Sequence, residues 1–267
     1  MRIVRVDGVV VAGRDGVALD DPLVRAGDGL LETMRARHGH IAHRAAHLAR
    51  LTASVQTLGM VGVPDLATIE ADLDAALDTL GAAHAMVRLI VNARPTLWVE
   101  LQSIGPLPAQ PAAASAITIP GGWSLRSRIA EHKTTSRAHW QWAERQAQAA
   151  GAEVALMTDA EGHLGESTRS SVFVVTGATL STAPVHGLLP GIGRRVLMEL
   201  HPGVLEDASR PSGWEAADEV FLVSALRGIT AVTVIDGRPV GRGSVGALTT
   251  QLATAYRKRV ITETTVG

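Results

Sequence analysis

Apolar residues recur at helical spacing in several stretches of the chain, and each of these stretches predicts an amphipathic helix. The clearest apolar stripe is formed by Leu48, Leu51, Val55 and Leu58, and Gly59 ends that helix. Further helices are expected from Asp65, as N-cap, to Gly81, from about Ser136 to Ala150, after Arg194, and from about Val245 to Val260.

Shorter apolar runs, bounded by turn residues, predict strands between these helices. Residues 1–12 are expected to form a hairpin around Asp7-Gly8, and Asp236-Gly237 predicts another hairpin turn. The remaining strands are expected at residues 30–37, 85–92, 96–103, 154–158, 172–176 and 219–226. Helices and strands mixed in this way predict an α/β (α+β mixed) fold.

A change in composition divides this pattern at residues 105–116. The segment GPLPAQPAAASA is rich in Pro and Ala and carries no charge, which is typical of a linker. We therefore expect a smaller N-terminal α/β domain over residues 1–106, a linker over 107–116 and a larger C-terminal domain over 117–267. Cofactors are commonly held between two domains, so the active site is expected there.

Composition limits the classes of protein to which this chain can belong. Of its 267 residues, 46% are hydrophobic and 19% are charged, which allows a large core. The formal net charge of −1 argues against nucleic acid or a membrane surface as the main partner. The chain has no cysteine, which excludes disulfides and thiolate metal sites. It has neither an apolar run of membrane-spanning length nor a secretory signal pattern, so a cytoplasmic protein is expected.

Two residues that suit one kind of chemistry, Lys133 and Glu166, lie at the two ends of a predicted helix–strand–strand unit. If this unit folds back on itself, both side chains reach one pocket. A lysine amine forms a Schiff base with a carbonyl, and a carboxylate keeps a pyridine nitrogen protonated. Pyridoxal phosphate needs both groups. Taken alone, however, Lys133 favours the interpretation of a solvated surface lysine, and Glu166 that of an ordinary exposed strand-end glutamate.

Two other motifs suggest ligand binding but favour simpler interpretations. His38, His40, His43 and His47 suggest a metal site, yet the segment lacks the glutamate of an HExxH motif and a nearby acidic ligand. We expect surface histidines at a strand–helix junction. Gly27-Asp28-Gly29 could form a phosphate loop, but it lacks the strand–turn–helix context, so a tight turn into a strand is favoured.

Four segments, in order along nearly the whole chain, resemble the class IV aminotransferase family of pyridoxal-phosphate enzymes, known as fold type IV. They are GDGLLETMRARHGHIAHRAAHLARL, HKTTSR, GAEVALMTDAEGHLGESTRSSVFVV and LLPGIGRR. The resemblance implies a two-domain fold of the D-amino-acid aminotransferase type and pyridoxal 5′-phosphate as cofactor. It also implies a homodimer in which the neighbouring subunit contributes to the active site.

The same resemblance assigns roles to individual residues. Lys133 is the catalytic lysine, Arg50 binds the cofactor phosphate as the arginine of an HLxRL pattern, and Glu166 lies at the ring nitrogen. The other cofactor-binding residues are Ser170, Ile192, Gly193, Ala225 and Leu226. The substrate-binding residues are Leu31, Arg35, Arg88 and Arg137.

Some positions depart from the family pattern. Leu31 stands where an aromatic residue is usual, which opens one wall of the substrate pocket. Gly193 replaces a threonine, so a hydroxyl contact with the phosphate is lost. The turn at residues 93–95 is shorter than the loop that binds the substrate carboxylate in many relatives.

The reaction is expected to be a lysis or a transamination, and in both the freed Lys133 removes a proton from the substrate α-carbon. The segment KTTSR and the strand end SALRG resemble aminodeoxychorismate lyase, whereas Ser136 and the short turn at 93–95 count against it. We favour the lyase, which yields 4-aminobenzoate and pyruvate. A transaminase of D-amino acids, (R)-amines or branched-chain amino acids is the alternative. A binding protein without catalysis is a remote third hypothesis.

Overall fold

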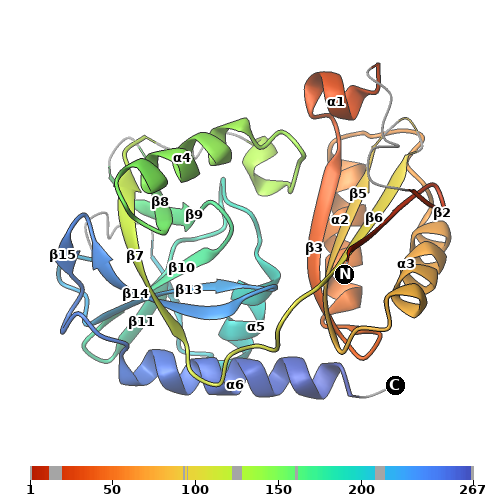
Figure 1. The fold of residues 1–267 in the computed structure, drawn as a ribbon. Helices are drawn as coiled ribbons and strands as arrows, with labels where there is room; N and C mark the ends of the chain where they lie inside the picture. The colour runs from red at the N-terminus through yellow and green to blue at the C-terminus, as the bar shows by residue number, and fades with distance from the viewer. Residues whose placement is uncertain are drawn as a thin grey trace. The chain divides into compact units, whose positions relative to one another are not determined.

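The computed structural model describes most of the chain, and its contacts divide the protein into two compact units (Figure 1). The described residues are 2–11, 20–92, 94, 96–121, 128–159, 162–207 and 214–265. Unit 1 comprises Met1–Pro106, His132–Arg137 and Val260–Gly267, and unit 2 comprises Leu107–Glu131 and Ala138–Arg259. The segment that contains Lys133 therefore groups with unit 1, whereas the sequence pattern assigned it to the C-terminal domain.

Unit 1 is built on an antiparallel sheet with the strand order β2-β1-β6-β5-β3-β4. Its strands are β1 (Arg2–Val6), β2 (Val9–Val10), β3 (Leu30–Arg37), β4 (His40–Ile41), β5 (His84–Val91) and β6 (Leu97–Ser103). Its helices are α1 (Pro22–Ala26), α2 (Arg44–Thr57) and α3 (Leu66–Leu80). The predicted N-terminal hairpin is confirmed, since Val6 pairs with Val9.

The core of unit 1 follows from two periodicities. Residues at alternate positions of β3 are buried, and three of them, Leu30, Met34 and Ala36, pack in one cluster with residues of α2 and α3 such as Leu48, Leu51 and Leu73. The predicted ends of α3 are confirmed. Asp65 accepts a hydrogen bond from the Thr68 backbone N–H at 2.8 Å, and Gly81 ends the helix in the left-handed region at φ 59°.

Unit 2 contains a sheet with the strand order β12-β11-β10-β13-β14-β7-β8-β9. Its strands are β7 (Ala112–Ile119), β8 (Val154–Thr158), β9 (Leu164–Ser167), β10 (Ser171–Thr176), β11 (Thr179–Thr182), β12 (Leu205–Glu206), β13 (Glu219–Ser224), β14 (Gly228–Ile235) and β15 (Arg238–Pro239). Strand β9 pairs with β8 and also with β10, so part of the sheet closes on itself. This closure is where Glu166 lies.

Strand β7 corrects the prediction of a linker over residues 107–116. It lies between β14 and β8, parallel to both, and pairs Ala112 with Thr230 and Ala116 with Val154. Ala114 and Ala116 are buried there. Small side chains without charge suit the buried positions of an interior strand, and the same composition is also typical of a linker.

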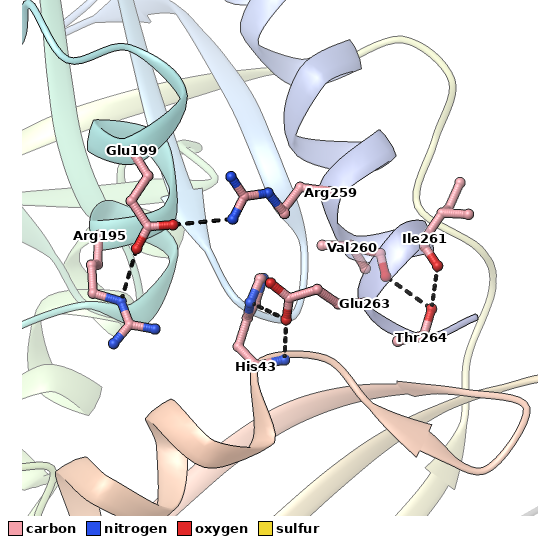
Figure 2. A network of polar contacts seen from close by, with 8 residues as sticks. All are labelled: His43, Arg195, Glu199, Arg259, Val260, Ile261, Glu263 and Thr264. Carbon is pink, nitrogen blue, oxygen red and sulfur yellow. Dashed lines mark hydrogen bonds and ion pairs between the residues drawn. The ribbon is translucent and has the colours of Figure 1, made fainter. Parts of the chain in front are cut away.

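The helices of unit 2 are α4 (Ala138–Ala149), α5 (Ile192–Leu200) and α6 (Ala247–Glu263), with a short 3-10 helix η1 (Arg128–Glu131). Within unit 2, Glu199 of α5 pairs with Arg195 at 3.5 Å and with Arg259 of α6 at 3.1 Å (Figure 2). The start of α6 is capped by Glu219, whose carboxylate accepts from the Thr249 backbone N–H at 2.7 Å.

The last turn of α6 belongs to unit 1, where Glu263 binds the start of α2. Its carboxylate lies 2.6 Å from Nδ1 of His43 and accepts from the His43 backbone N–H at 3.1 Å (Figure 2). His43 is the N-cap residue of α2 and makes no side-chain cap of its own, so Glu263 takes over that function. Among the helices of the described residues, none is long and apolar enough to cross a membrane.

Candidate active site

The segment with Lys133 is fixed by backbone hydrogen bonds at the start of β3. The Leu31 N–H donates to the Lys133 carbonyl oxygen at 2.8 Å, and Leu30 forms an isolated antiparallel bridge with Thr134. Both Lys133 and Leu31 are partly buried. The structure thus brings the predicted catalytic lysine next to one predicted substrate residue, although 102 positions separate them in the sequence (133 − 31).

Gly27 and Gly29 make this close approach possible. Gly27 ends α1 in the left-handed region at φ 63°, and its carbonyl oxygen accepts a hydrogen bond from Oγ1 of Thr135 at 2.6 Å. A Cβ at Gly29 would lie 2.8 Å from Cδ1 of Leu23 and 3.0 Å from the Val91 carbonyl oxygen. The interpretation of this motif as a tight turn into a strand is therefore confirmed, and the turn holds the lysine segment.

The predicted phosphate ligand Arg50 forms a bidentate ion pair with Glu32 of β3. Its Nε donates to Oε1 at 2.8 Å and its Nη2 donates to Oε2 at 2.6 Å. His47, one helical turn before Arg50, places Nδ1 at 2.8 Å from Oε2 of the same carboxylate. The side chains of Glu32 and His47 are each 1% exposed and that of Arg50 is 10% exposed.

This environment lowers the pKa of Glu32. Burial of the carboxyl group raises its pKa, but the charge of Arg50 and the hydrogen bonds from His47 and Arg50 more than offset that effect. The pKa of Glu32 falls from 4.5 to about 2. Glu32 is therefore ionised at neutral pH, in the middle of the apolar face of β3.

The same cluster corrects the expectation of surface histidines. His38 and His40 are exposed, but His43 and His47 are 8% and 1% exposed. Each of the two buried rings faces a carboxylate, Glu263 for His43 and Glu32 for His47, which is what allows burial. In the described part of the chain, no group of three or more metal-ligating side chains could hold a metal ion.

The predicted substrate arginines of unit 1 already have protein partners. Arg35 is 7% exposed and donates to the Gly105 carbonyl oxygen at 2.9 Å. Arg88 pairs with Glu100 at 3.0 Å while its side chain remains 40% exposed. Arg137, four positions after Lys133, is partly buried. Residues 93 and 95 of the short turn lie outside the described residues.

In unit 2, the predicted partner of the ring nitrogen lies on β9. Glu166 is 8% exposed and opposes Ser171 of β10, and Ser170 precedes that strand. Together with Ser171 and Arg194, Glu166 lines a small recess. A carboxylate that is nearly buried and still reaches a recess fits the role of holding a protonated ring nitrogen.

The start of α5 has the character of an anion site. Its N-cap residue is Gly191, which has no side chain to cap the first backbone N–H groups, and the first two helical residues are Ile192 and Gly193. A Cβ at Gly193 would lie 3.2 Å from Cγ2 of Val223 and 3.3 Å from the Tyr256 hydroxyl oxygen. The glycine thus allows α5 to pack tightly on β13.

Ala225 and Leu226 lie in the turn that joins β13 to β14 and are partly buried. Each unit therefore carries its own share of the predicted cofactor residues. Unit 1 assembles Lys133 and Arg50 around the start of β3, and unit 2 carries Glu166 and the open start of α5. A single pocket that joins these two sets remains a prediction.

Comparison with known proteins gives an independent view of the family. Residues 29–235 match the family described as amino-transferase class IV. A "branched-chain-amino-acid aminotransferase-like protein 2" of Arabidopsis thaliana is 25% identical over 94% of this chain. The chain spans about half the length of that relative, 49%.

Two further matches extend over almost the whole length of both proteins. A "bifunctional aminodeoxychorismate lyase / D-amino acid transaminase" of Mycobacterium tuberculosis is 27% identical, over 95% of this chain and 98% of its own. The crystal structure of a branched-chain aminotransferase of Thermoproteus uzoniensis with norvaline superposes with a TM-score of 0.85 at 24% identity, and the match covers 98% of this chain and 95% of the other. At this identity the structural match supports the fold.

Proposed function

Because the chain belongs to the class IV aminotransferase family, we propose that it is a pyridoxal-phosphate enzyme whose cofactor is bound to Lys133. The residues fit the cofactor group by group. Arg50 and the backbone N–H groups at the start of α5 suit a phosphate, and the buried carboxylate of Glu166 suits a protonated ring nitrogen. When bound, pyridoxal phosphate supplies an electron sink for a substrate carbanion.

The protein side chains then divide the remaining work. The amine of Lys133 takes a proton from the substrate α-carbon and returns it at the next step. The carboxylate of Glu166 stabilises the proton on the ring nitrogen, since an opposite charge favours the charged form.

We infer that the substrate is an amino compound with carboxylate groups, and we favour aminodeoxychorismate, which would be cleaved to 4-aminobenzoate and pyruvate. The observation that carries this proposal is Arg137, four residues after Lys133, partly buried and in the same compact unit. A guanidinium matches a carboxylate with two parallel hydrogen bonds. The bifunctional lyase relative supports the same reaction.

A D-amino-acid transaminase is the second candidate. The name of the M. tuberculosis relative combines both activities, which supports this alternative beside the lyase. The ion pair between Arg88 and Glu100 also favours a smaller substrate. Because the charge of Arg88 is already paired, this arginine contributes less to binding a second substrate carboxylate. A branched-chain transaminase is a further alternative, which the name of another relative supports.

A product assay distinguishes these reactions. Purified protein is incubated with aminodeoxychorismate, and separately with D-alanine, a branched-chain amino acid or an (R)-amine plus a 2-oxo acid acceptor. The lyase predicts 4-aminobenzoate and pyruvate in equal amounts. Transfer of the amino group from D-alanine without lysis would favour the transaminase, and no turnover of any substrate would contradict both.

Arg137→Ala tests the substrate assignment directly. It should raise the KM for aminodeoxychorismate by on the order of 30-fold or more, as for a lost charged hydrogen-bonding partner. A simple amine without a carboxylate should be little affected. The exposed Arg145 of α4 offers a matched control, since Arg145→Ala removes the same charge elsewhere. An equal loss on both substrates would show that Arg137 is structural.

We also propose that the protein is a homodimer, as the family resemblance implies. Exposed apolar side chains such as Ile129, 59% exposed, and Trp142, 43% exposed, supply apolar surface for association. Analytical ultracentrifugation should give twice the mass of 28.0 kDa. A fully active species at the single-chain mass would contradict the proposal.

A further inference from the structure

A polar face on α2 stands out against the apolar core of unit 1. His47, Arg50 and Ser54 follow one another at spacings of three and four residues, so they lie on one side of the helix. Opposite them, β3 carries Glu32 among the buried Leu30 and Met34. Nothing in the periodicity of β3 requires a carboxylate at this inward position.

A buried ion pair at such a position is not explained by stability alone. Removing two charges from water costs free energy that their attraction only partly returns, and apolar side chains of similar volume are often at least as stabilising. The Glu32–Arg50 pair is nearly fully buried. The ion pair is therefore better explained by the orientation that it gives to the Arg50 side chain.

The geometry of the pair fixes that orientation. Glu32 uses both carboxylate oxygens on the Nε–Nη2 edge of Arg50, which defines the plane and rotation of the guanidinium group. The side chain reaches that arrangement before any ligand arrives, so binding requires less ordering of a long, flexible residue.

His47 in turn fixes Glu32. Its Nδ1 donates to Oε2, because an ionised carboxylate can only accept. Its Nε2 is buried and has no hydrogen-bond partner within the described residues, so the polar contact of this ring there is the one with Glu32. His47 thus restricts the orientation of the Glu32 carboxylate, and Glu32 restricts that of the Arg50 guanidinium group.

We propose that Glu32, held by His47, is a positioning residue that sets Arg50 for the cofactor phosphate. The proposal rests on the proposed function, since it takes the ligand of Arg50 to be that phosphate. The expected effect of removing Glu32 also differs from the effect expected from charge alone. If only charge mattered, removing the negative Glu32 would strengthen the attraction of Arg50 for an anion. If Glu32 positions Arg50, its removal weakens phosphate binding.

The test compares pyridoxal 5′-phosphate with pyridoxal, which lacks the phosphate. Dissociation constants for both are measured by absorbance titration of the wild type and of Glu32→Gln, which keeps the volume but replaces one of the two acceptor oxygens with an N–H donor. We expect affinity for the phosphate form to fall at least about tenfold, the range for hydrogen bonds to charged groups, and affinity for pyridoxal to stay within about twofold.

The control is a carboxylate in a comparable setting. Glu100 of β6 has a side chain that is 8% exposed and pairs with Arg2 and Arg88, so Glu100→Gln also removes a nearly buried charge from two arginines of unit 1. Its preference for the phosphate form over pyridoxal should equal that of the wild type. A similar loss of this preference in both variants would indicate a general effect on the unit.

His47 gives a second, milder test that does not depend on the folding of Glu32→Gln. His47→Asn retains an N–H donor near the position of Nδ1 and should keep the preference for the phosphate form, whereas His47→Leu should reduce it. Unchanged or tighter binding of the phosphate form by Glu32→Gln, or equal preferences in the two His47 variants, would overturn the inference alone. A wild type that binds neither compound would overturn the proposed function as well.

Discussion

Acidification should destabilise the protein through Glu32 in a defined pH range. The folded state lowers the pKa of this carboxyl group from 4.5 to about 2, so the unfolded chain binds its proton first as the pH falls. The contribution to stability is therefore fully present above about pH 4.5 and is lost as the pH falls towards 2. A shift of this size corresponds to on the order of 3 kcal/mol, and burial means that solvent does not screen it.

Urea unfolding monitored by circular dichroism between pH 6 and the acid limit of the folded state measures this contribution. The free energy of unfolding of the wild type should exceed that of Glu32→Gln at pH 6, and the gap should narrow as the pH falls below about 4.5. Asp78→Asn, at an exposed position of α3, is the control and should follow the wild type. If the difference in free energy of unfolding between wild type and Glu32→Gln stayed constant with pH, ionisation of Glu32 would not be what stabilises the folded state.

The remaining predictions concern unit 2. Glu166→Gln should keep the cofactor but lower kcat by about 100-fold or more in a turnover assay, because the ring nitrogen loses its proton; wild-type rates would place Glu166 outside the site. Gly193→Thr, which restores the residue usual in the family, should lower the free energy of unfolding by about 1–3 kcal/mol, since even its Cβ would crowd β13. Gly105→Thr is the control, because a Cβ at this position meets nothing within 4 Å, and it should be tolerated. Thermal unfolding measures both variants.

The order of elements could be predicted from the sequence because local signals agree with the fold over most of the chain. Asp65 and Gly81 bound α3 as a side-chain cap and a left-handed residue, and both signals are visible without any tertiary contact. Strand β7 could not be predicted in this way. Its alanines are explained by the strands on either side of it, β14 and β8, which follow it in the sequence.

The candidate site shows the same limit more sharply. The resemblance identified Arg50, but its partner Glu32 was missed, and His47 was interpreted as a surface residue. A signal for Glu32 was present in the alternation of β3, where position 32 falls on the same face as Leu30 and Met34. To interpret this charge as half of a buried ion pair, one must know where α2 packs on the sheet. The sequence of β3 does not contain that information.

Reductive trapping of the cofactor tests directly whether Lys133 is the lysine that binds it. Purified protein loaded with pyridoxal 5′-phosphate is treated with borohydride, digested and analysed by mass spectrometry. Only Lys133 and Lys258 are available as lysines in the chain, so the modified peptide has two possible identities. The cofactor mass is expected on the peptide that contains Lys133. Modification of Lys258 instead, or no trapped cofactor at all, would contradict this assignment.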